Sequence, residues 1–200
     1  CNRLRPRAFY MGGGTPGILT PDQMDAILTA LEESFDLSAC PEITVEIGRP
    51  DTITAEKLAV LKSHGVTRVC VNPQTMEEHV LAAIGRRHAA SDTVRAMELV
   101  RAYRFPHVNM DLIAGLPADT ADGFAESLRQ VMALGPSNIT VHTLALKKGA
   151  DIEKLVSIPS RESIGRFKYV PEKDIEDTYK TVCAAIDSEI KAVVDAREEY

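Results

Sequence analysis

Hydrophobic and polar positions alternate between two periods along most of this 200-residue chain. Short apolar runs rich in β-branched residues indicate strands, and segments whose apolar residues recur every three or four positions indicate amphipathic helices. The pattern predicts strands over residues 9–11, 42–47, 66–71, 108–113 and 138–146, and helices over 21–34, 54–64, 77–84, 91–103 and 120–134. This alternation predicts parallel βαβ units, either in an open doubly wound sheet or in most of a β/α barrel.

Local signals place several helix ends and one face of each helix. Thr20-Pro21-Asp22-Gln23 combines an N-cap hydroxyl, a proline at the first helical position and a glutamine that can close a capping box. Gly65 stands where a left-handed residue ends a helix. The helical side chains expected to face the core are Met24, Ile27, Leu28, Leu31, Leu58, Leu61, Val94, Met97, Val100, Phe124, Leu128 and Val131.

The tail of the chain has a different pattern. Residues 151–170 are irregular, and from Ile175 to Val193 apolar residues repeat every three or four positions, as in one long helix. We therefore divide the chain into residues 1–150, which we expect to form the partial barrel, and residues 151–200, which we expect to form an irregular linker and an amphipathic helix.

Composition and charge exclude several classes of protein. The net charge of −6 arises from 29 acidic and 23 basic residues mixed along the chain, without the basic stripe typical of nucleic-acid binding. We see no signal peptide and no apolar run of the roughly 18 residues that a membrane helix needs, so no membrane partner is expected. The cysteines, Cys1, Cys40, Cys70 and Cys183, lack the spacing of a zinc site or a disulfide framework, which favours the reducing cytoplasm.

Candidate binding residues follow the predicted strands. In parallel β/α folds, ligands bind at the carboxyl ends of the strands, so polar residues there are the first candidates. Three consecutive glycines leave the backbone open to close approach by a ligand. The candidates are Gly12, Gly13 and Gly14 with Thr15, Glu46, Asn72 and Gln74, Arg86 and Arg87, Asp111, and His142.

Each candidate has a structural alternative. The glycines could form only a tight connection, Glu46 could face solvent, and Gln74 could bond within its own loop. Asp111 lies in a run expected to be buried on both faces, where an unpaired carboxylate is costly, so a cation or a ligand hydroxyl is its expected partner. We find no Ser-His-acid arrangement, no Walker loop and no metal-cluster spacing, which favours a protein that binds a cofactor.

Six motifs, in order, resemble the radical S-adenosylmethionine enzymes of the oxygen-independent coproporphyrinogen III oxidase group, especially its coproporphyrinogen dehydrogenase branch. The resemblance runs from Phe9 to about Ala150. The motifs are Gly12-Gly13-Gly14-Thr15-Pro16, Thr44-Val45-Glu46-Ile47, Val71-Asn72-Pro73-Gln74-Thr75-Met76, Ile84-Gly85-Arg86-Arg87-His88, Asn109-Met110-Asp111-Leu112-Ile113-Ala114-Gly115-Leu116-Pro117 and Thr140-Val141-His142-Thr143-Leu144-Ala145.

The resemblance implies a fold and a cofactor site. The fold would be a partial β/α barrel of the radical S-adenosylmethionine type. By this resemblance Gly13, Gly14 and Thr15 would hold the methionine end of S-adenosylmethionine. Glu46, Gln74, Arg86 and Asp111 would contact its amino-acid and ribose portions, and Ile113 with Ala145 would line the adenine pocket. The resemblance assigns no catalytic residue and no metal ligand within this chain.

The resemblance also implies a reaction. A [4Fe–4S] cluster, reduced by a flavodoxin or ferredoxin, would cleave S-adenosylmethionine, and the resulting radical would abstract hydrogen from the propionate side chains of a porphyrinogen. Coproporphyrinogen III would be decarboxylated oxidatively to protoporphyrinogen IX, a step of haem biosynthesis. Members of the family hold the cluster through a Cys-x3-Cys-x2-Cys motif upstream of the glycine turn, and this sequence contains none.

We therefore expect the cluster ligands to lie outside this chain, which begins Cys1-Asn2-Arg3 and looks like an N-terminally truncated member of the family. The chain alone would then not cleave S-adenosylmethionine, and the full-length form would be the enzyme. Two alternatives remain open from the sequence. One is a haem-binding chaperone that shares the barrel, and the other is an inactive scaffold fragment.

Overall fold

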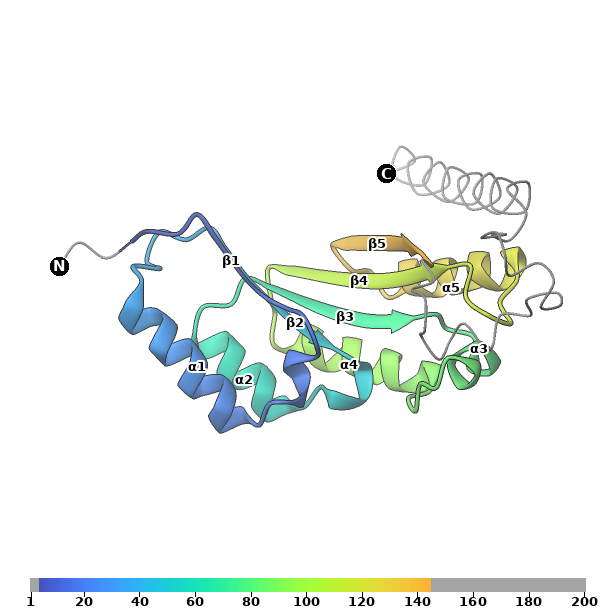
Figure 1. The fold of residues 1–200 in the computed structure, drawn as a ribbon, viewed down its shortest axis with the longest axis horizontal. Helices are drawn as coiled ribbons and strands as arrows, with labels where there is room; N and C mark the ends of the chain where they lie inside the picture. Colours follow the sequence, from blue (N-terminus) through green and yellow to red (C-terminus); the bar gives the residue numbers. More distant parts are fainter. Residues whose placement is uncertain (1–3, 145–200) are drawn as a thin grey trace, which may run out of the picture.

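The computed structural model describes residues 4–144, in which five strands alternate with helices (Figure 1). The predicted tail over 151–200 lies outside the described residues. The strands are β1 (Ala8–Met11), β2 (Glu42–Gly48), β3 (Arg68–Gln74), β4 (His107–Ala114) and β5 (Asn138–Thr143). The helices are α1 (Pro21–Ser34), α2 (Ala55–Ser63), α3 (Glu78–Ala83), α4 (Ala90–Ala102) and α5 (Ala121–Ala133), with 3-10 turns η1 (Pro16–Ile18) and η2 (Pro50–Thr52).

The order of the strands decides between the two predicted architectures. All neighbouring strands are parallel, and they lie side by side in chain order, β1-β2-β3-β4-β5. A doubly wound sheet reverses its order at a switch point, whereas a β/α barrel adds each strand beside the previous one. The fold is therefore an α/β half-barrel, with α1, α2 and α4 on the same side of the sheet (Figure 1).

The two faces of the sheet differ in chemistry because successive strand residues point to opposite sides. Apolar residues of the strands and helices make up the core, including the fully buried Val45, Ile47, Val69, Val71, Met110, Leu112, Met24, Leu58, Leu61 and Val100. The alternate positions form what we call the inner face, opposite the helices. It carries Tyr10, Thr44, Glu46, Arg68, Cys70, Asn72, Asn109, Asp111, Thr140 and His142.

Two β-bulges lie near the carboxyl ends of the central strands. One extra residue of β2 lies between Glu46 and Gly48, and one extra residue of β3 lies between Val71 and Gln74. Bulges are frequent next to active sites because they redirect side chains. The predicted end of this strand at residue 71 is wrong, because the bulge accommodates Pro73, which lacks an N–H, and pairing resumes at Gln74.

Most helix signals are confirmed. Thr20 and Gln23 form the capping box, at 3.2 and 3.0 Å, and Gly65 has a φ of 68°. Two predicted core residues are wrong, since Ile27 is 43% and Val94 37% exposed. The buried stripes of α1 and α4 are narrower than a full apolar face, and α4 buries Thr93, Ala96, Met97 and Val100 instead. Among residues 4–144, no helix is long and apolar enough to span a membrane.

Candidate functional site

The loop after β1 presents open backbone at the carboxyl end of the sheet. A Cβ added at Gly13 or Gly14 would meet no atom within 4 Å, and Gly13 has a φ of 108°, which L side chains rarely adopt. The Thr15 hydroxyl donates to the Gly14 carbonyl oxygen at 2.5 Å. The loop therefore has the room and the exposed backbone that close approach of a ligand requires.

The same loop is anchored on its other side. A Cβ at Gly17 would lie 2.0 Å from the Ile47 carbonyl oxygen, so the turn η1 packs directly on the end of β2. The ammonium of Lys57, in α2, donates to the carbonyl oxygens of Gly17 at 2.5 Å and Thr52 at 3.0 Å. The loop that carries Gly13 and Gly14 is thus held in place by its contacts with β2 and α2.

Glu46 lies on the inner face between two hydrogen-bond donors from the adjacent strands. The Tyr10 hydroxyl, on β1, donates to Oε2 at 2.9 Å, and Nδ2 of Asn72, on β3, donates to Oε1 at 2.8 Å. The carboxylate is therefore held between three strands and does not simply extend into solvent.

Asp111 lies on the same face of β4 and has the polar partners that its burial demands. Nδ2 of Asn109 donates to Oδ1 at 2.6 Å, and Nε2 of His142, on β5, lies 3.9 Å from Oδ2. Burial raises the pKa of Asp111, the Asn109 bond and His142 oppose that rise, and the charge of Glu46 adds to it. Glu46 and Asp111 are therefore close enough for their negative charges to repel each other.

The negative charges of Glu46 and Asp111 also affect the pKa values of Tyr10 and Cys70. Burial is the largest cause of the raised pKa of Tyr10, and the hydrogen bond to Glu46 raises that pKa further. Cys70 and Asp111 contribute less. Burial also raises the pKa of the Cys70 thiol to about 11, with Asp111 and Glu46 contributing. Cys70 is consequently a protonated, unreactive thiol at neutral pH.

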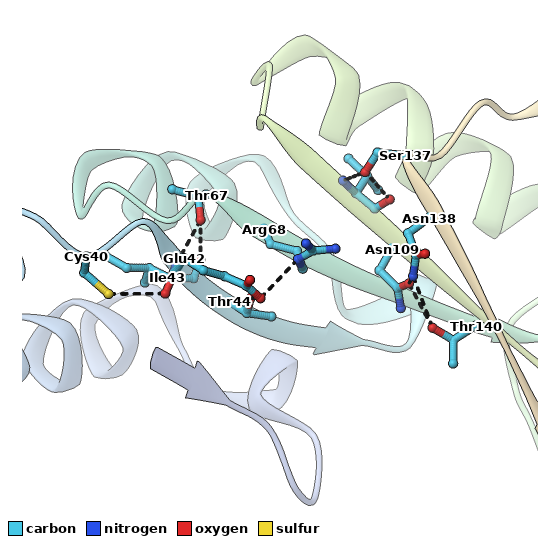
Figure 2. Close-up of polar contacts among 11 residues, drawn as sticks. Cys40, Glu42, Ile43, Thr44, Thr67, Arg68, Asn109, Ser137, Asn138 and Thr140 are labelled. Carbon is cyan, nitrogen blue, oxygen red and sulfur yellow. Dashed lines mark hydrogen bonds and ion pairs between the residues drawn. The ribbon is translucent and has the colours of Figure 1, made fainter. Parts of the chain in front are cut away.

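The amino-terminal half of the inner face carries a separate set of polar contacts, drawn in Figure 2. Nε of Arg68 lies 3.4 Å from Oε1 of Glu42, linking β3 to β2. Oδ1 of Asn109 accepts hydrogen bonds from the Asn138 amide and, at 3.0 Å, from the Thr140 hydroxyl. These contacts orient the Asn109 amide, whose Nδ2 in turn donates to Asp111.

Gln74, at the end of β3, has a strained backbone. Its φ is 73° although it is not glycine, and its side chain is buried. The preceding carbonyl, of Pro73, accepts a hydrogen bond from Nε2 of His88 at 3.3 Å. His88 is 3% exposed, and its Nδ1 has no partner among the described residues. Burial lowers the pKa of His88, so the neutral ring donates through Nε2.

Arg86 follows α3 at a helix end built by Gly85. Gly85 has a φ of 70°, and the Arg86 N–H donates to the Leu81 carbonyl oxygen at 2.9 Å, as in a Schellman motif. Burial lowers the pKa of Arg86, Arg49 lowers it further, and Asp51 opposes both. Arg86 therefore lies beside the loop after β2, whereas Arg87 is exposed.

The structure thus brings only some of the predicted site residues together. Glu46 and Asp111 share one electrostatic environment, and the glycine loop lies beside Glu46 through Gly12, where a Cβ would be 2.8 Å from Oε2. Arg86 lies instead near Arg49 and Asp51 of the loop after β2, and Gln74 lies at the end of β3. Ile113 is half-buried on β4, and Ala145 lies outside the described residues.

Sequence reasoning missed two residues of this site. Tyr10 was included only in an apolar run, yet its alternation with Phe9 and Met11 was a signal that it faces the same side as Glu46. His88 was included only as the last residue of a motif, because its contact with Pro73 depends on the path of the chain around α3. Among residues 4–144, no group of three or more His, Cys, Asp or Glu side chains could hold a metal ion.

The chain is a parallel β/α half-barrel with acids and an open glycine loop at the carboxyl ends of its strands, where such barrels bind ligands. The family model of the radical SAM superfamily matches residues 2–131, and the chain belongs to that superfamily.

Individual relatives point to one group within the superfamily. The chain is 43% identical over 152 residues to the oxygen-independent coproporphyrinogen-III oxidase-like protein HemZ of Bacillus subtilis, covering 76% of this chain and 30% of that protein. It is 31% identical over 186 residues to the heme chaperone HemW of B. subtilis, covering 91% and 46%. The structure of coproporphyrinogen III oxidase HemN from Escherichia coli, a radical SAM enzyme, matches with a TM-score of 0.70 at 27% identity, covering 79% and 37%.

These relatives confirm the resemblance to the coproporphyrinogen oxidase-like group and the half-barrel fold. The chain spans less than half the length of each of the three.

Proposed function

We propose that the described half-barrel binds S-adenosylmethionine at the carboxyl ends of its strands. The observation that carries this proposal is the pair of inner-face acids, Glu46 and Asp111, beside an open glycine loop. A carboxylate with one donor per oxygen keeps further acceptor positions for a ligand. Ammonium and ribose hydroxyl groups, both present in S-adenosylmethionine, are donors that such acids would accept.

The other predicted residues fit the remaining parts of this cofactor. The glycine loop would receive the methionine end, and Arg86 carries a guanidinium that pairs well with a carboxylate. Gln74 and Ile113, at the ends of β3 and β4, would contact the ribose and adenine portions, with Ala145 beyond the described residues. The residues present therefore fit S-adenosylmethionine, while residues 4–144 hold no group suited to a [4Fe–4S] cluster.

For the full-length protein we propose radical oxidative decarboxylation of coproporphyrinogen III to protoporphyrinogen IX. The bound cofactor, with a cluster and an electron donor such as a flavodoxin or ferredoxin, would supply a radical that abstracts hydrogen from a propionate side chain. The side chain would then lose carbon dioxide and pass one electron to an electron acceptor, which leaves the vinyl group. The similarity to the HemZ and HemN relatives supports this assignment. The test is anaerobic reconstitution of the full-length form with dithionite and coproporphyrinogen III. Formation of 5′-deoxyadenosine and protoporphyrinogen IX is expected, and 5′-deoxyadenosine absent under these conditions would contradict an enzyme.

A second candidate, a haem chaperone, is favoured by the similarity to HemW, which extends over 91% of this chain. Haem titration of the full-length form separates the two functions. A stoichiometric complex with a stable Soret band, together with no turnover of coproporphyrinogen III, would favour the chaperone. A third outcome, in which neither haem nor S-adenosylmethionine binds, would favour an inactive scaffold.

A further inference from the structure

Glu46 is the centre of a contact that spans three strands, which we call the Glu46 bridge. It consists of the Tyr10 hydroxyl on Oε2, at 2.9 Å, and the Asn72 amide on Oε1, at 2.8 Å. Each carboxylate oxygen therefore has one protein donor, one from β1 and one from β3, and the two hydrogen bonds together favour one orientation of the carboxylate. Neither Tyr10 nor Asn72 is among the residues expected to contact the cofactor.

The backbone is shaped to permit this bridge. A Cβ at Gly12 would lie 2.1 Å from Cε1 of Tyr10 and 2.8 Å from Oε2 of Glu46, so a side chain at this position would displace both groups. The first glycine of the run therefore serves the bridge, whereas Gly13 and Gly14 leave open space for a ligand. The three glycines have two different roles.

The surroundings of the Asn72 side-chain amide indicate that its main role is the hydrogen bond to Glu46. Asn72 is 6% exposed, and its Oδ1 is buried without a hydrogen-bond partner among the described residues. An unsatisfied buried acceptor is costly, and such groups are typically kept where function requires them. The amide is thus oriented by its bond to Glu46 rather than by neighbours on its other side.

We propose that Tyr10 and Asn72 are positioning residues that hold the Glu46 carboxylate in the orientation in which it receives the ammonium group of S-adenosylmethionine, a role that rests on the proposed function. Restraining the carboxylate before binding removes the entropic cost of ordering it. The free acceptor position on each oxygen remains available to the ligand. The charged or titratable groups that face Glu46 are Tyr10 from β1, Cys70 from β3 and Asp111 from β4.

The test is the dissociation constant of S-adenosylmethionine, measured by isothermal titration of the 200-residue chain and its variants. Tyr10→Phe and Asn72→Ala should each weaken binding roughly three- to tenfold, since each leaves one carboxylate oxygen unrestrained. Thr44→Val is the matched control. Thr44 lies on the same strand and the same face as Glu46, but its hydroxyl donates to Glu42 at 3.0 Å. Its replacement should therefore change the dissociation constant by less than about twofold.

A second background separates positioning from general packing. In Glu46→Gln, which removes the charge, Tyr10→Phe should change the dissociation constant by less than about twofold. The same loss in both backgrounds would overturn the proposal, because a purely structural effect does not depend on the charge at position 46. Binding that is unchanged in Tyr10→Phe and Asn72→Ala would overturn the bridge alone. An unmodified chain that binds no S-adenosylmethionine would overturn the proposed function, and the role of the bridge with it.

Discussion

The ammonium of Lys57 lies 2.5 Å from the carbonyl oxygen of Gly17 and so ties helix α2 to the loop that carries the open glycines. A second bond from the same ammonium, to the Thr52 carbonyl oxygen at 3.0 Å, joins this loop to η2. Burial lowers the pKa of Lys57, because removal from water disfavours the charged ammonium. One side chain therefore connects two loops at the carboxyl ends of the strands.

Replacing Lys57 should loosen that end of the sheet. Lys57→Met leaves two carbonyl groups without their donor and should lower the free energy of unfolding by roughly 1–3 kcal/mol, measured by urea denaturation. It should also weaken S-adenosylmethionine binding. Lys62→Met is the control, because Lys62 lies on the same helix but donates to the Arg104 carbonyl oxygen, away from the site. Equal effects on binding in the two variants would contradict this role.

The glycines of the loop should separate stability from binding. Gly17→Ala places a Cβ against the Ile47 carbonyl oxygen and should destabilise the fold by about 3 kcal/mol. Gly14→Ala meets open space, so the free energy of unfolding should change by less than about 0.5 kcal/mol while S-adenosylmethionine binding weakens. Thermal unfolding and calorimetric titration of both variants provide the measurements. A Gly14→Ala variant that binds normally would show that the open space is not used.

The ionised Asp111 side chain should lower the stability of the fold but strengthen the binding of S-adenosylmethionine. Its pKa is raised, chiefly by burial, so its ionised form is less stable in the folded chain than in the unfolded chain. Asp111→Asn should therefore be as stable as the unmodified chain or more stable at pH 7, yet bind S-adenosylmethionine roughly tenfold more weakly, because a neutral amide replaces a charged acceptor. Thr44→Val is the inner-face control, because the Thr44 hydroxyl donates to Glu42 and not to Asp111, so binding should change less than about twofold. Strong destabilisation by Asp111→Asn would contradict the electrostatic argument.

His64 should make stability depend on pH. It caps α2, and its ring nitrogens lie 2.8 Å from Oε1 of Glu32 and 3.0 Å from Oδ1 of Asp25, both on α1. Burial alone would lower the pKa of His64, but the bonds to Asp25 and Glu32 raise it above its usual value. A raised folded-state pKa gives stability that is fully present below the unfolded pKa of about 6.5 and is lost as pH rises through the folded pKa.

The measurement is the free energy of unfolding of the unmodified chain and His64→Asn across pH 5.5 to about 9. The difference between them should be largest at the acid end and shrink as pH rises. The double variant Asp25→Asn/Glu32→Gln, which removes both charged partners of the ring, should abolish the trend. A difference that is constant with pH would mean that the charge on His64 does not support the contact between α1 and α2.

The sequence predicted the elements of this fold because helix caps and apolar periods are local signals, as the capping box of Thr20 and Gln23 shows. It could not choose between the doubly wound sheet and the barrel, since strand order depends on contacts between distant segments. Gln74 illustrates another limit: positive φ is usually indicated by glycine or asparagine, so a glutamine held there by a bulge gives no sequence signal.

The candidate site was predictable in part for the same reason. Polar residues at strand ends, such as Glu46 and Asp111, could be found by position alone. Their partners could not, because the contact of Glu46 with Tyr10 and Asn72 requires the register of three strands. The position of Arg86 beside Arg49 and Asp51 likewise depends on the path of the chain between α3 and the loop after β2.

If S-adenosylmethionine binds at the carboxyl ends of the strands, over the glycine loop, its addition must change the environment of that loop. The measurement is the change in backbone amide NMR shifts of the chain during titration with S-adenosylmethionine. Saturable shifts are expected at Gly13, Gly14 and Gln74, while the amides of α1 and of His64 should be unaffected. Shifts confined to the helices, or no saturable shifts at the glycine loop, would contradict binding at this site.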